Sequence, residues 1–158
     1  MVRKGWVKAT NIQRNRVRYL ITPKGIAEKA RISREYLAAS VKLYSEARER
    51  IHCTLSALSL RWAPESAVKR VVFFGGGEVA EIGYVCLQET DLQLVGVIDD
   101  ARPKPFFGVP VHPVDRLSPH ALDGVPYGRI IVMSFSDQAS ICRTLDDRGI
   151  PSNLVEWI

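Results

Sequence analysis

Hydrophobic residues recur along the chain with different periods, and each period predicts a kind of element. Residues 23–62 place apolar side chains every three or four positions, from Ile26 through Leu37 to Trp62, which is typical of a helix. The runs "RVVFFG", "LQLVGVIDD" and "YGRIIVMSF" are almost continuously apolar and predict buried strands. The runs "GWVKAT" and "RVRYLIT" predict the two strands of a hairpin, at residues 5–10 and 16–21.

The helical pattern begins at a turn that suits a helix start. Thr22 can cap free backbone N–H groups, and Pro23 fits the first helical position. A helix of nearly forty residues is about 55–60 Å long, more than a small domain can cover, so we expect residues 23–62 to pair with a second copy in a homodimer. The alternative is a break near Arg31 and Ile32, with Ser33 capping a second helix that packs within the chain.

Strands and helices alternate in the second part of the chain. "RVVFFG" is followed by the helical pattern "EVAEIGYVCLQET", and "YGRIIVMSF" by "SDQASICRTLDDRGI". This alternation predicts an α/β fold, a small Rossmann-like parallel sheet at residues 68–158. Ahead of it we expect a β-hairpin and a long helix at residues 1–62, and a linker at residues 63–67.

Charge divides the chain in a similar way. Residues 1–64 hold 14 Lys and Arg against 4 Glu and no Asp, net +10, whereas residues 65–158 hold 8 against 13, net −5. A basic half indicates a polyanionic partner, such as double-stranded DNA, although a solvated basic helix surface is the alternative. The candidate DNA-binding residues are those of the hairpin: Lys8, Arg14, Arg16 and Arg18.

Three glycines separate the first buried strand from its helix. Residues 75–80 fit G-x-G-x-x-G/A with Ala80 last, a pattern in which the glycines allow a tight turn and close approach of a pyrophosphate. The helix N-terminus favours a phosphate, and an aspartate ending the next strand can accept from ribose hydroxyls. Residues expected to contact NAD(H) or another nucleotide are Gly75, Gly76, Gly77, Glu78, Val79, Asp99, Asp100 and Ser134. The alternative is that the glycines only turn the chain and the aspartates only cap a strand end.

The stretch "KGWVKATNIQRNRVRYLITPKGIAEKARISREYLAASVKLY" resembles the C-terminal part of winged-helix regulators of the MarR type, in the branch associated with exopolysaccharide gene clusters. The most specific piece is "YLITPKGIAEKARIS". The resemblance implies that residues 1–62 are a partial winged-helix segment, in which residues 6–21 are the wing and the dimer helix follows. In that family the recognition helix precedes this segment, so either an upstream segment supplies base readout or these residues act in dimerisation and docking.

Residues 68–158 resemble the N-terminal nucleotide-binding domains of bacterial polysaccharide-biosynthesis proteins. The motifs "GGGEVA", "LVGVIDD", "FGVPVHPVDRL" and "RGIP" occur in that order. This resemblance implies a nucleotide or nucleotide-sugar ligand.

The chain lacks three common catalytic motifs: the Tyr-x-x-x-Lys pair, H-E-x-x-H and the nucleophile elbow. We therefore expect that it has no catalytic residues and is not an enzyme. The three cysteines follow no metal-ligand pattern, so we expect reduced thiols and no bound metal. No apolar run is long enough for a membrane span, so we expect a cytoplasmic protein.

Three functions fit these observations. We favour a dimeric transcription-regulator-like protein whose Rossmann-like domain binds a nucleotide and modulates DNA binding. The alternatives are a non-catalytic nucleotide or nucleotide-sugar binding module of polysaccharide biosynthesis without DNA binding, and a structural scaffold.

Overall fold

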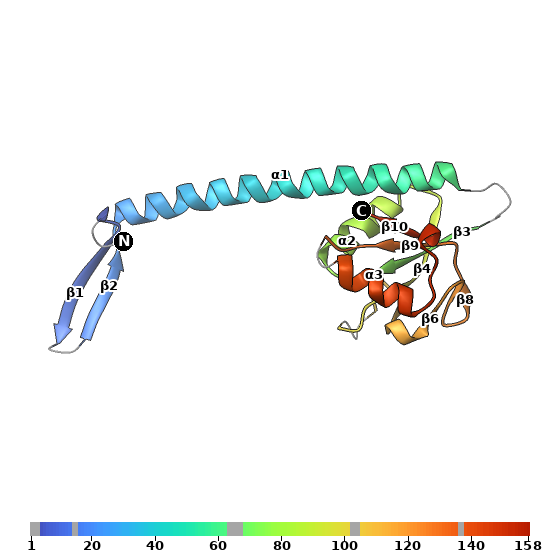
Figure 1. The fold of residues 1–158 in the computed structure, drawn as a ribbon. Coiled ribbons are helices and arrows are strands. Elements are labelled where there is room, and N and C mark those ends of the chain that lie inside the picture. The colour runs from blue at the N-terminus through green and yellow to red at the C-terminus, as the bar shows by residue number, and fades with distance from the viewer. Residues whose placement is uncertain (1–3, 14–15, 63–67, 102–104, 136–137) are drawn as a thin grey trace. The chain divides into compact units, whose positions relative to one another are not determined.

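The computed structural model describes residues 4–13, 16–62, 68–101, 105–135 and 138–158 (Figure 1). The chain forms two compact units, Met1–Glu46 and Ala47–Ile158. The boundary between them falls within helix α1 (Pro23–Arg61), because the last turns of this helix pack into the core of the second unit. The expected linker, residues 63–67, lies outside the described residues.

The first unit begins with the expected hairpin. Strands β1 (Val7–Gln13) and β2 (Arg16–Ile21) pair antiparallel, with Val7 opposite Ile21. The first strand reaches further along the chain than its apolar run indicates, because a register shift between Asn11 and Gln13 lets the ladder absorb an extra residue.

The hairpin is joined to the start of α1 by a set of close backbone contacts. Thr22 caps the helix as expected, since its hydroxyl accepts from the N–H of Gly25 at 3.0 Å, and it also donates to the carbonyl of Gly5 at 2.8 Å. The N–H of Thr22 donates to the carbonyl of Trp6 at 3.0 Å. A Cβ on Gly25 would lie 2.0 Å from the same carbonyl oxygen, so glycine is required there.

Helix α1 is continuous over 39 residues. It passes through Arg31 and Ile32 without interruption, so the alternative of two helices is wrong. The side chain of Arg31 forms ion pairs with Glu28 at 2.8 Å and with Glu35 at 2.6 Å, at the spacings that stabilise a helix.

The second unit contains a five-stranded sheet in the order β10-β9-β3-β4-β5, and every neighbouring pair is parallel. Its strands are β3 (Lys69–Phe74), β4 (Leu92–Ile98), β5 (Val111–His112), β9 (Arg129–Val132) and β10 (Val155–Trp157). Helix α2 (Glu78–Leu87) follows β3, and helix α3 (Gln138–Asp147) follows β9. The predicted α/β, Rossmann-like parallel sheet is therefore confirmed.

A small three-stranded antiparallel sheet lies between β5 and β9 in the chain, and the sequence pattern did not predict it. It consists of β6 (Leu117–Ser118), β7 (Ala121–Leu122) and β8 (Val125–Pro126), with the 3₁₀ turns η2 (Val114–Arg116) before it and η3 (Ser152–Leu154) before β10. Strands of two residues are too short to show a period. The Asp123–Gly124 pair was the available signal, because both residues have positive φ, 46° and 82°, as a tight hairpin turn requires.

The main sheet is covered on both faces. One face packs Val71, Phe73 and Ile131 against α2 and against the last turns of α1, where Ile51 and Leu55 are buried. The opposite face packs alternate strand residues, Val72, Ile130 and Val132 among them, against Leu145 of α3 and Leu122 of the small sheet. Covering on both faces explains why the strands read as continuous apolar runs.

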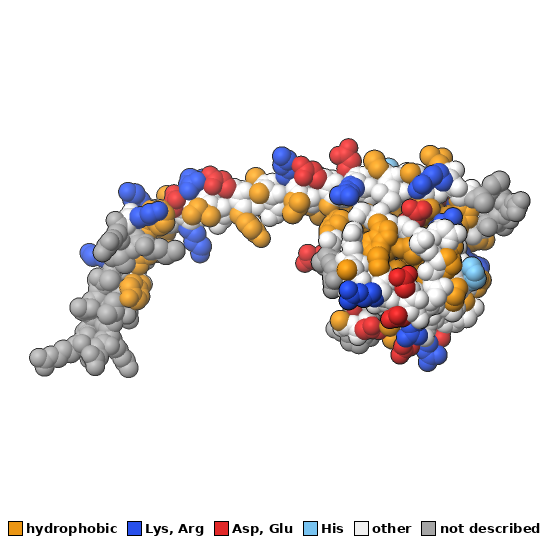
Figure 2. Space-filling view, viewed as in Figure 1, with side chains coloured by type: hydrophobic (Ala, Val, Ile, Leu, Met, Phe, Trp, Pro, Cys, Tyr) orange, Lys and Arg blue, Asp and Glu red, His pale blue; other side chains and the backbone are white. Residues whose placement is uncertain are grey.

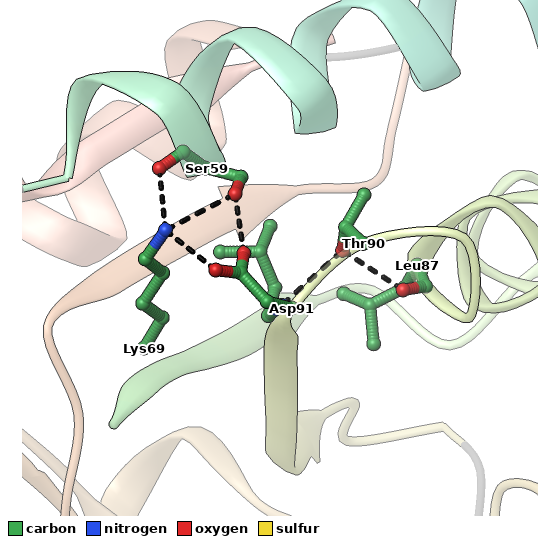
Figure 3. Close-up of polar contacts among 6 residues, drawn as sticks. Ser59, Lys69, Leu87, Thr90 and Asp91 are labelled. Carbon is green, nitrogen blue, oxygen red and sulfur yellow. Dashed lines mark hydrogen bonds and ion pairs between the residues drawn. The ribbon is translucent and has the colours of Figure 1, made fainter. Parts of the chain in front are cut away.

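A polar cluster fastens the end of α1 to the sheet (Figure 3). The ammonium of Lys69 lies 2.7 Å from both the carbonyl of Ser59 and the carboxylate of Asp91, and the hydroxyl of Ser59 donates to the same carboxylate. The bond from Lys69, followed by that from Ser59, lowers the pKa of Asp91. The cluster therefore contributes stability above the ordinary pKa of an aspartate, and this contribution is lost as pH falls through the lowered value.

We predict that Gly25→Ala loosens the joint between the hairpin and α1. Alanine favours a helix over glycine by about 1 kcal/mol, so helix propensity alone would make the variant more stable. The clash of the added methyl group with the Trp6 carbonyl is the reason to expect a loss of stability instead. Hydrogen exchange of residues 16–30 is expected to become faster in the variant, with residues 68–158 unchanged as the internal control. Slower exchange at the joint would contradict the prediction.

Candidate functional site

The strand order creates a crevice at one edge of the sheet. The first strand in the chain, β3, is central, and the chain adds β4 and β5 on one side of it and β9 and β10 on the other. The carboxyl ends of β3 and β9 therefore border the point where the winding direction reverses. Ligands of open α/β sheets bind in the crevice at such a point.

The glycine run forms a tight turn at this edge. Gly75 has φ +97°, and a Cβ there would lie 3.3 Å from the carbonyl oxygen of Met133. Its N–H donates to the carbonyl of Ile98 at 2.8 Å, and the N–H of Gly76 donates to the carboxylate of Asp99 at 2.8 Å. Two consecutive hydrogen bonds thus hold the turn against the end of β4.

Gly77 begins helix α2 without needing to be glycine for its backbone. Its φ of −77° and ψ of −166° suit any residue, and a Cβ there would have no neighbour within 4 Å. The space beside Gly77 is therefore open to an approaching group. No N-cap side chain accepts from the first-turn N–H groups of α2, and N–H groups at a helix start can bind an anion.

The carboxylates of Asp99 and Asp100 both accept hydrogen bonds from backbone N–H groups. Asp99 accepts from Gly76 with one oxygen and from the N–H of Ala101 at 2.9 Å with the other. Asp100 accepts from the N–H of Val114 at 3.0 Å and so ties β4 to the segment after β5. Each carboxylate oxygen has a second lone pair, so Asp99 can brace the turn and still accept a hydroxyl.

A cavity of about 200 Å³ lies at the carboxyl ends of β3, β4 and β9. It brings together four of the predicted residues, Gly75, Asp99, Asp100 and Ser134. Among the described residues, its other walls are the apolar side chains of Phe74, Ile98 and Ile141, which no sequence motif marks as ligand contacts. A carboxylate pair beside an apolar wall suits a sugar ring, whose edge carries hydroxyls and whose face is apolar.

The other predicted nucleotide contacts lie beside this cavity. Gly76 is buried in the turn, and Gly77 and Glu78 are exposed. Val79 packs its side chain against the core, so any contact of Val79 with a ligand depends on its backbone. Glu78 and Glu81 make the first turn of α2 acidic, which stabilises the helix and opposes a phosphate.

Small residues let α2 approach the sheet closely. Ala80, assigned this function from the sequence, is fully buried. Gly83 lies one turn later, and a Cβ there would lie 2.7 Å from the terminal methyl of Met133, so the Met133 side chain would have to shift to admit it. Its position one turn after Ala80 on the apolar face was the available signal.

The candidate DNA-binding residues belong to the hairpin. Lys8 lies on β1 and is exposed, Arg14 lies outside the described residues, and only the backbone of Arg16 and Arg18 on β2 is described. Thr10 pairs with Arg18 and Gln13 with Arg16 in the ladder.

The cysteines form no disulfide; Cys53 and Cys142 are exposed and Cys86 is buried, and burial raises the pKa of the Cys86 thiol. Within the described ranges, no group of three or more His, Cys, Asp or Glu side chains could hold a metal ion. In the same part of the chain, no helix is long and apolar enough to span a membrane. Comparisons with family models, curated proteins and solved structures found no match to this chain.

We predict that the glycines differ in tolerance to alanine. Gly75→Ala should lower the free energy of unfolding by about 1–2 kcal/mol, since alanine disfavours φ +97°. Gly77→Ala should change it by less than about 0.5 kcal/mol, since the added methyl group enters open space. Urea unfolding followed by circular dichroism measures both, and equal losses would show that the turn geometry is not the constraint.

Proposed function

We propose that the protein is a nucleotide-responsive regulator: the second unit binds a nucleotide at the carboxyl edge of its sheet, and the basic hairpin of the first unit contacts DNA. The observation that carries the proposal is the open space beside Gly77, at the start of α2, next to a cavity lined by Asp99. A catalytic set is not part of the proposal.

The residues of the site fit the parts of a nucleotide. Phosphates would lie over Gly77 and the first-turn N–H groups of α2, to which no N-cap side chain bonds. The ribose would lie in the cavity, with its hydroxyls toward Asp99 and its apolar face toward Ile98 and Ile141. A cavity of about 200 Å³ holds a sugar and not a whole dinucleotide, so the base would lie outside it.

Asp99 also indicates which nucleotides are excluded. A carboxylate at the end of the second strand accepts from a free ribose hydroxyl and repels a 2′-phosphate. The proposal therefore covers NAD(H) and nucleotide sugars and excludes NADP(H).

Introducing a negative charge at Gly77 tests the nucleotide site. Asp and Asn cap a helix equally well, so Gly77→Asp and Gly77→Asn should be as stable as the parent chain or slightly more so. The carboxylate repels a phosphate and the amide does not, so Gly77→Asp should bind at least tenfold more weakly than Gly77→Asn. Calorimetric titration with NAD⁺, NADH and a UDP-sugar measures the affinities, and NADP⁺ is the specificity control.

Two results would overturn the nucleotide site. One is that none of these nucleotides binds the unmodified chain. The other is that the Asp and Asn variants bind equally, which would place the phosphate elsewhere.

DNA contact rests on the charge of the first unit. Residues 1–46 hold 11 Lys and Arg against 3 Glu, and residues 47–158 hold 11 against 14 acidic residues. Phosphate contacts by such a unit give an affinity that falls steeply with salt.

We predict that Lys8→Ala weakens binding to duplex DNA and lowers the slope of log affinity against log salt by about one. Lys42→Ala removes the same charge from the exposed surface of α1, away from the hairpin, and serves as the matched control. Fluorescence anisotropy with a labelled duplex measures both. Nucleotide binding without any DNA affinity would favour the alternative, a nucleotide-binding module with no DNA partner.

A further inference from the structure

A phenylalanine borders the cavity at the carboxyl edge of the main sheet. Phe135 is 53% exposed and comes directly after Ser134, which lines the cavity beyond the end of β9. Ile141, in the first turns of α3, lines the same cavity. Consecutive Cα atoms are only about 3.8 Å apart, so Phe135 lies next to the wall that Ser134 forms.

Exposure alone does not distinguish Phe135 from other residues. Figure 2 shows hydrophobic side chains at the surface of the second unit among charged ones, and single exposed hydrophobic residues are ordinary. Phe107 is a useful comparison, because it is 57% exposed in the same unit. Its ring stacks on that of Tyr84, with the centroids 4.6 Å apart and the planes 2° apart. The chain itself therefore covers one face of the Phe107 ring.

Phe135 has no such cover. Within the described ranges, it takes part in no ring stacking and no cation–π contact, and it is not part of the two hydrophobic clusters that flank the sheet. Aromatic rings stack favourably on other flat rings, beyond the gain from burying apolar area. A ring that no other ring covers, beside a cavity that suits a sugar, is thus placed to contact a flat group attached to that sugar.

This position fits the part of a nucleotide that the cavity is too small to hold. The cavity has a volume of about 200 Å³, and its walls come from both sides of β3, with Asp99 beyond β4 and Ser134 beyond β9. A ribose that occupies it leaves the base outside. Because the base is bonded directly to the ribose, a base outside the cavity lies at its rim, where Phe135 is.

Stacking also favours one class of base. Every base has a π-face, so a phenyl ring accepts adenine and uracil alike and does not read the hydrogen-bonding edge of either. The two-ring system of adenine covers more of the phenyl ring than uracil does. A site that holds its base by stacking therefore binds an adenine nucleotide more tightly than the uridine nucleotide with the same sugar.

We propose that Phe135 is the base-binding residue of the nucleotide site: its ring stacks on the base, and adenine nucleotides bind more tightly than uridine nucleotides. This inference rests on the proposed nucleotide site and adds the residue that holds the base. The side chain acts on ligand affinity and not on the fold, because it is exposed and lies outside both hydrophobic clusters.

Calorimetric titration with ADP-glucose and UDP-glucose, which differ only in the base, tests the stacking. The unmodified chain should bind ADP-glucose more tightly. Phe135→Leu keeps an apolar side chain without an aromatic face, so it should weaken ADP-glucose binding by about 5- to 100-fold and bring the two affinities together. Phe135→Trp should retain the affinity, and ADP-glucose should quench its fluorescence beyond the quenching seen in the unmodified chain. Phe107→Leu removes an equally exposed ring and should leave both affinities unchanged.

The outcomes separate this inference from the proposed function. An unmodified chain that binds neither nucleotide overturns the proposed site and the stacking together. If the unmodified chain binds and Phe135→Leu binds equally well, or if Phe107→Leu loses as much affinity as Phe135→Leu, the stacking is wrong and the nucleotide site stands. Equal or tighter binding of UDP-glucose by the unmodified chain overturns the preference for adenine.

Discussion

The bond between the carboxylate of Asp99 and the N–H of Gly76 holds the site together. It joins the end of β4 to the turn after β3 at 2.8 Å, and a charged acceptor makes it one of the stronger bonds of the second unit. The start of α2 and the opening of the cavity both depend on this turn. Asp99 therefore has two functions in the proposed site. It positions the turn whose backbone would bind a phosphate, and its carboxylate would accept a hydrogen bond from a ribose hydroxyl.

Helix α1 carries one apolar column, Leu37, Tyr44, Ile51 and Leu58, that is covered over only part of its length. Its apolar column continues through both halves, yet the sheet covers only the half that contains Ile51 and Leu58. The cluster of Ser59, Lys69 and Asp91 fastens the covered end. In the described part of the chain, Leu37 and Tyr44 on the other half remain exposed.

Much of the second unit followed from local pattern. The runs ending at Phe74 and Ile98 are strands, and the glycines turn the chain as their motif predicts. Three features were beyond that pattern. The small sheet has strands of only two residues, Gly25 is required by a carbonyl nineteen positions earlier, and Ile141 reaches the cavity from a helix far along the chain.

The sequence by itself determined the main helices and strands, the parallel α/β class, the glycine turn and the basic character of the first unit, because each depends on residues close together in the chain. Only the tertiary structure decided that Asp99 braces Gly76, that Asp100 is engaged by Val114, and that the apolar column of α1 is covered at one end alone. Those features depend on which residues far apart in the chain come into contact. Such contacts produce no periodic pattern in the sequence, so the sequence alone does not predict them.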